Sequence, residues 1–155
     1  MDVYARIMKE RAGPLLAKLV ADRTGLLRWV SAVRLIEVSG RAGALAAANA
    51  LPLEVETYAI PDADSFKKES EIFCNFVNSE LKEQDVDPKP VADQFLGSAR
   101  WPVQVLGVQC AKTTGAVELK DKVAALSGEK MALPGWGEPK SFGELAAEVA
   151  AELAP

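Results

Sequence analysis

Residues 64–83 read DSFKKESEIFCNFVNSELKE, and this stretch decides the fold class. Its large apolar residues recur at spacings typical of one helix face. They are Phe66, Ile72, Phe73, Phe76, Val77 and Leu81. The charged residues lie mostly outside that face, and Asp64 or Ser65 supplies a side-chain oxygen that caps a helix start. We therefore predict an amphipathic helix over 64–83 that buries one face in a core.

The composition favours helices in the rest of the chain as well. The 155 residues are 49% hydrophobic and 26% charged, values typical of a single globular domain, here spanning 1–155. Aromatic residues make up only 6%, whereas the helix formers Ala, Leu, Glu and Lys are abundant. We predict a mostly α, irregular multi-helix domain with C-terminal helices at about 114–126 and 141–154. Ser141 and Glu144 have the spacing of a capping box at the start of the last helix.

Two short segments admit an alternative to helix. Residues 53–60 contain strand-forming types and alternate loosely, so they fit a short strand or an extended connector. Residues 103–108 form a short apolar run, which fits a strand or a helix equally well. If both are strands, they pair as one short two-stranded β element.

Glycine and proline divide the N-terminal third. We expect one helix over 2–12, an interruption at Gly13-Pro14, and a second helix over 14–22 with its core face formed by Leu15, Leu16, Leu19 and Val20. Thr24-Gly25 is the next break. The following helix has Leu26, Trp29, Val30 and Val33 spaced three or four apart, with Ile36 as a further candidate for this face. Ser39-Gly40 and Gly43 weaken its middle before Pro52 ends it.

Charge separates the first third of the chain from the second. Residues 1–50 contain eight basic and four acidic side chains, whereas residues 51–100 contain five basic and eleven acidic ones. A basic N-terminal region indicates either a solvated surface or a contact with acidic protein, anionic lipid or RNA. For a partner interface the candidates are Arg28, Trp29, Arg34, Arg41 and Trp136. Trp136 lies in a predicted loop, where a tryptophan either fills its own core or inserts into a partner.

Several classes of protein are excluded or disfavoured. Residues 26–51 form the most apolar long stretch, but they carry four charged side chains, so we expect no transmembrane segment. Asp2 and Tyr4 follow Met1 where a secretory signal needs a basic and then an apolar stretch, so we expect no signal peptide. Cys74 and Cys110 have no motif spacing, so we expect free thiols and an intracellular, reducing compartment; a disulfide or a redox pair is the alternative.

The chain contains no histidine, which removes much catalytic and metal chemistry. Histidine is the usual general base near neutral pH and the commonest metal ligand. Ser–His and Cys–His nucleophile pairs are therefore impossible, and two cysteines do not supply the common zinc ligand sets. We predict no catalytic residue, no metal and no cofactor.

Lys112-Thr113 is the one fragment that resembles a phosphate-binding loop. Such a loop needs glycines where this chain has Leu106 and Ala111, since backbone amides must approach the phosphates closely. A small enzyme or ligand-binding domain using Lys112 and Thr113 is thus the alternative function. No arrangement of aromatic and basic residues matches a nucleic-acid-binding signature, so we expect no DNA partner.

The sequence therefore favours a non-enzymatic accessory or structural subunit of a larger multiprotein assembly. Its partners would be other protein subunits, and an organellar energy-transducing membrane complex, such as a mitochondrial one, is a candidate assembly. Peripheral contact with anionic lipid or RNA through the basic N-terminal third is a further alternative.

Overall fold

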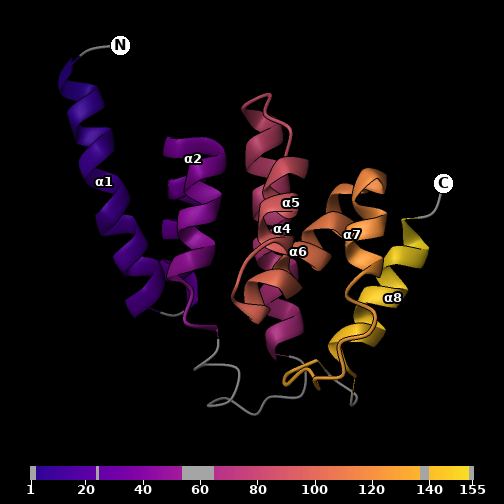
Figure 1. Cartoon of the computed structure of the whole chain (residues 1–155). Coiled ribbons are helices and arrows are strands. Elements are labelled where there is room, and N and C mark those ends of the chain that lie inside the picture. The colour runs from indigo at the N-terminus through magenta and orange to yellow at the C-terminus, as the bar shows by residue number, and fades with distance from the viewer. Residues whose placement is uncertain (1–2, 24, 54–64, 137–139, 154–155) are drawn as a thin grey trace. The chain divides into compact units, whose positions relative to one another are not determined.

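The computed structural model describes residues 3–23, 25–53, 65–136 and 140–153 (Figure 1). The chain divides into two compact units. Unit 1 comprises Met1–Pro52 and Ser79–Asp87, and unit 2 comprises Leu53–Asn78 and Pro88–Pro155. The mostly α class is confirmed, because the described residues form helices and no strand. That 1–155 is a single domain stays a prediction.

Unit 1 is built on two helices that pack side by side, α1 (Val3–Asp22) and α2 (Gly25–Ala50) (Figure 1). The expected interruption at Gly13-Pro14 is wrong, since α1 runs through Pro14. Proline removes one backbone donor, and the packing of α1 against α2 offsets that loss. The break at Thr24-Gly25 is confirmed, because α1 ends at Asp22 and α2 begins at Gly25.

Helix α2 consists of two halves that meet at Gly40, as the glycines in its middle indicated. Gly40 has φ 59° and ψ −132°, a conformation open to glycine and strained for other residues. Beyond this kink the two halves lie in direct backbone contact, because a Cβ built on Gly43 would overlap the carbonyl group of Leu35. The buried positions of the second half include Ala44, Ala47 and Ala48, whose small side chains permit close packing.

The Gly43→Ala variant should therefore lower the free energy of unfolding by about 1–3 kcal/mol, the usual effect of overpacking a tight contact. Gly13→Ala is the matched control, since nothing lies within 4 Å of a Cβ built there. Alanine in a helix interior is favoured over glycine by roughly 0.5–1 kcal/mol, so the control should be neutral or stabilised. Urea unfolding of both variants makes the comparison, and equal effects would show that the close approach at Gly43 is unimportant.

Helix α4 (Ser65–Glu83) confirms the amphipathic helix expected over 64–83; residue 64 lies outside the described residues. Four members of the expected apolar face are buried, namely Phe66, Phe73, Val77 and Leu81. Ser70 and Cys74 complete that face. Residues 65–78 of α4 belong to unit 2 and residues 79–83 to unit 1.

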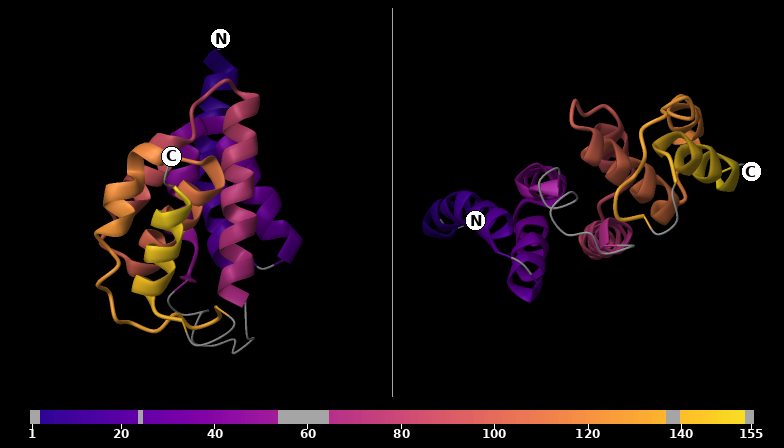
Figure 2. Two further views of the ribbon diagram at one scale, coloured as in Figure 1. Left: turned by 90° about the vertical axis from the view of Figure 1, so that its right-hand side faces the viewer. Right: turned by 90° about the horizontal axis from the view of Figure 1, so that it is seen from below.

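The rest of unit 2 begins with α5 (Lys89–Leu96) and α6 (Trp101–Thr114), which pack closely against each other. A Cβ built on Gly107 in α6 would lie 2.7 Å from the backbone nitrogen of Leu96, so glycine permits that approach. Helices α7 (Lys120–Ala124) and α8 (Phe142–Glu152) pack against each other, and α8 also packs on α6 (Figure 2).

Of the two alternatives for 103–108, the helix is confirmed and the strand is wrong, because these residues lie inside α6. Pro102 occupies the first turn of that helix, where its missing N–H has no partner to lose. Residues 105–111 are all buried, so the segment shows none of the periodicity that distinguishes a surface helix from a strand. In the other segment, residues 54–60 lie outside the described residues. The one β-type pairing in the described chain is an isolated antiparallel bridge between Ala132 and Ser141.

The C-terminal helices are partly as expected. The helix expected over 114–126 does not begin at Thr113 or Thr114, because both residues belong to the last turn of α6. Their hydroxyl groups donate hydrogen bonds to carbonyl groups one turn earlier in that helix. Gly115 then ends α6 with φ 65°, and a 3₁₀ turn (Val117–Leu119) leads into the short α7. The start expected at Ser141 is confirmed, since its Oγ accepts a hydrogen bond from the Glu144 amide at 3.1 Å.

Candidate interaction surface

Unit 1 exposes large apolar side chains on both of its long helices. Leu15 on α1 is 61% exposed, and on α2 the exposed fractions are 80% for Leu26, 46% for Leu27 and 54% for Val30. The sequence placed Leu15, Leu26 and Val30 on core faces, and that placement is wrong. In the first half of α2 the buried positions are Arg28, Ser31, Ala32, Leu35 and Ile36, and the charge of Arg28 hides this face in the sequence.

Leu26, Leu27 and Val30 form what we call the apolar tip, because they occupy the first turn and a half of α2. Leu26 and Val30 are four residues apart and Leu27 and Val30 three, so their side chains are neighbours on the helix surface. The next exposed side chains along α2 are Arg34 and Glu37, which form an ion pair at 2.8 Å. The exposed apolar surface of α2 is therefore about one helical turn long.

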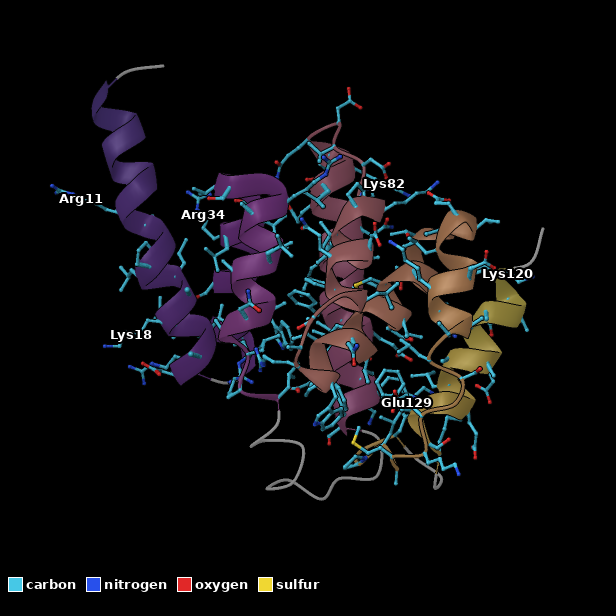
Figure 3. All side chains as sticks on the ribbon, viewed as in Figure 1. Arg11, Lys18, Arg34, Lys82, Lys120 and Glu129 are labelled. Carbon is cyan, nitrogen blue, oxygen red and sulfur yellow. A yellow bond between two sulfur atoms is a disulfide. The ribbon has the colours of Figure 1, made fainter. Side chains whose placement is uncertain are left out.

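Two exposed basic side chains lie close in sequence to the start of α2. Lys18 and Arg23 are exposed at and beyond the last turns of α1, next to the start of α2. Figure 3 shows Arg11 and Lys18 projecting from α1 away from α2. Asp22 is the exposed acid among them.

Acidic side chains of α4 and α2 lie around Glu80. Burial raises the pKa of Glu80 on α4, and the charges of Glu83 on α4 and Glu37 on α2 raise it further. Glu37 lies eleven residues after Leu26, roughly 16 Å along a helix axis. Unit 1 is therefore basic near the apolar tip and acidic away from it.

Three of the predicted interface residues hold unit 1 together or lie partly inside it. Arg28 is only 2% exposed, and its Nε donates a hydrogen bond to the Val20 carbonyl at 2.9 Å, which ties α2 to α1. Arg41 is exposed, and its Nε donates to the carbonyl of Asp87 at 3.0 Å. Trp29 is half-buried. Among the predicted arginines of α2, Arg34 is the one with a largely exposed side chain near the apolar tip.

Trp136 is buried inside unit 2, as the self-filling alternative predicted. Its side chain is 6% exposed, and its ring meets Phe66 edge to face with centroids 5.4 Å apart. The preceding Gly135 adopts φ 70°, and its carbonyl accepts a hydrogen bond from the Lys67 amide at 3.0 Å. These contacts fasten the loop to the start of α4. A contact between Trp136 and a partner stays a prediction.

The expectation of free thiols is wrong, because Cys74 and Cys110 form a disulfide. Cys74 lies on α4 and Cys110 on α6, and their Cα atoms are 5.0 Å apart, within the usual range for such a bond. Both side chains are almost fully buried. Because the two cysteines are 36 residues apart in sequence, no local motif indicates the bond.

The alternative site at Lys112-Thr113 lacks the geometry of a phosphate-binding loop. Such a loop connects a strand to a helix, whereas Lys112 and Thr113 lie in the last turn of α6. The Lys112 side chain is half exposed and pairs with Glu152 at 3.7 Å. The Thr113 hydroxyl donates to the Gln109 carbonyl at 3.0 Å.

No family model, curated protein or solved structure matches the chain. Within the described ranges, no group of three or more cysteine and acidic side chains lies close enough to hold a metal ion. Among the helices of those ranges, none is long and apolar enough to cross a membrane.

Proposed function

We propose that the protein is a non-enzymatic accessory subunit of a larger multiprotein assembly, and that the helix pair α1–α2 carries its main contact surface. One observation supports this proposal: of the six large apolar side chains that are exposed in the described part of the chain, four lie on α1 and α2. Clustered exposed apolar residues mark interaction sites on proteins, whereas single ones are ordinary.

The charges of the same helices indicate the kind of partner. From residue 11 to residue 50, six basic side chains stand against two acidic ones, so an acidic surface on a neighbouring subunit is complementary. Arg34 and Arg11 lie exposed at the edge of this surface, where charges guide association more than they fix affinity. We propose an organellar energy-transducing membrane complex, such as a mitochondrial one, as the assembly.

Leu15→Glu should release the protein from its partner subunits. Leu15 is 61% exposed, so the change leaves the fold of unit 1 intact, but it places a carboxylate in an apolar contact. We expect at least about a tenfold loss of co-purifying subunits, corresponding to roughly 1.4 kcal/mol of binding free energy. The measurement is gentle affinity purification of the tagged full chain from its native source, followed by sizing and mass spectrometry of the eluate.

Val117→Glu is the matched control, because Val117 is also exposed but lies in unit 2. It should retain the full set of partner subunits at fixed stoichiometry. Recovery of the unaltered chain as a lone 16.6 kDa monomer would refute the proposed function. Equal loss of partners in both variants would refute the assignment of the contact to α1 and α2.

A further inference from the structure

The proposed protein contact is tested at Leu15 on α1, and the apolar tip on α2 can have an occupant of its own. Its three side chains lie at the end of the helix pair, directly after the two residues that connect α1 to α2. Leu26 is the most exposed of the large apolar side chains described, at 80%. We propose that this end of unit 1 binds the surface of an anionic lipid bilayer, with the apolar tip inserted among the lipid headgroups.

The length of the apolar surface fits shallow insertion. From Leu26 to Val30 a helix rises roughly 6 Å, and helices at a membrane interface bury their apolar face to a depth of about 5–10 Å. Beyond Val30, the ion pair of Arg34 with Glu37 is exposed and stays in water. An apolar surface of this length does not span a bilayer, but it reaches the boundary between headgroups and acyl chains.

The charges beside the tip fit an anionic surface. Lys18 in the last turns of α1 and Arg23 just beyond it are exposed, against one exposed acid, Asp22, and can contact lipid phosphates and carboxylates as the tip inserts. The acidic group of Glu37, Glu80 and Glu83 lies farther along unit 1, so repulsion from the bilayer is small in this orientation. Apolar insertion and electrostatic attraction thus favour the same orientation.

A groove-binding partner helix fits the tip less well. Such a helix pair needs apolar anchors at positions i, i+3 or i+4, and i+7 over two turns or more. Seven residues after Leu27 stands Arg34, which is already paired with Glu37. The one-turn apolar surface therefore favours lipid over a helical protein partner.

The test is flotation of the full chain with vesicles of phosphatidylcholine alone or with about one-third phosphatidylserine as the anionic lipid. We expect binding to the anionic vesicles, weakened by salt, and at least about tenfold less binding to the neutral ones. The variant Leu26→Ser/Leu27→Ser should lose about tenfold in affinity for anionic vesicles, as should Lys18→Glu/Arg23→Glu. The controls Val117→Ser and Lys120→Glu/Lys130→Glu change similar groups in unit 2 and should bind normally.

Absence of binding to anionic vesicles would overturn the inference, as would tip variants that bind as well as the controls do. The outcome is separable from that of the proposed function. Loss of partner subunits in the Leu26→Ser/Leu27→Ser variant, together with no vesicle binding by the unaltered chain, would reassign the tip to a protein contact. Vesicle binding that survives Leu15→Glu would support the lipid surface even if the subunit proposal failed.

Discussion

Reducing the disulfide between Cys74 and Cys110 should lower the free energy of unfolding by about 3–4 kcal/mol, the chain-entropy value for a closed loop of this length. The bond joins α4 to α6 across a sequence separation of 36 residues, and both cysteines are buried in unit 2. Breaking it frees the unfolded chain to sample many more conformations. Urea unfolding with and without reductant measures the effect as a shift of the transition to lower urea concentration.

The double variant Cys74→Ala/Cys110→Ala provides the control. It should unfold at the same urea concentration with and without reductant, close to that of the reduced unaltered protein. If reductant leaves the unaltered protein unchanged, the covalent link contributes nothing to stability.

The same cysteines report on the compartment. Disulfides form and persist in oxidising compartments and are rare in reducing ones. Protein taken from its native source and alkylated before any reductant should therefore stay unmodified at Cys74 and Cys110. Modification at both positions would support the reducing compartment expected from the sequence.

Phe66→Ala should destabilise unit 2 by about 3–5 kcal/mol, the usual cost of removing a buried phenylalanine ring. The ring is 1% exposed and lies edge to face with two tryptophans, at 6.0 Å from Trp101 and 5.4 Å from Trp136. Its removal leaves a cavity and ends both aromatic contacts. The loop that carries Trp136 should then loosen, so tryptophan fluorescence should shift to longer wavelength before global unfolding.

Two variants separate ring loss from a general effect on α4. Phe66→Leu keeps most of the apolar volume and should cost less than half as much, because the cavity is smaller. Phe76→Ala removes a half-buried ring from the same helix and should cost less than Phe66→Ala. Similar losses for Phe66→Ala and Phe76→Ala would show that the stack of Phe66 with the tryptophans has no special weight.

The sequence predicted those elements whose signals are local. Helix α4 was predictable because one of its faces is apolar and the others are charged. The start of α8 was predictable because Ser141 and Glu144 cap it within one turn. Gly40 and Gly43 likewise indicated the weak middle of α2, since glycine is needed where backbone conformation or close approach excludes a side chain.

The features that the sequence did not predict depend on residues far apart in the chain. Helix α6 resembled a strand because it is buried on nearly all sides, which removes the periodic signal. The disulfide depends on packing that brings α4 to α6.

The candidate surface was missed for a related reason. Arg28 lies on the buried face of α2, where it donates a hydrogen bond to the Val20 carbonyl. Because a charged residue is not expected on a buried face, the sequence pattern pointed to Leu26 and Val30 as core residues instead. The sequence predicted a contact through the basic N-terminal third, but not the exposed apolar residues on which the proposed contact rests.

Because of the kink at Gly40, the directions in which side chains point are determined separately in the two halves of α2. One residue turns an α-helix by about 100°. A single-residue deletion between the apolar tip and Gly40 would therefore rotate the tip relative to the close contact at Gly43. At Gly40 the helical rotation is interrupted, so it does not continue from the first half into the second. Changes of chain length after Gly40 leave the direction of Leu26 and Val30 untouched. Residues added or removed at the end of α2, beyond the contact of Gly43 with Leu35, therefore leave the orientation of the tip on α1 unchanged.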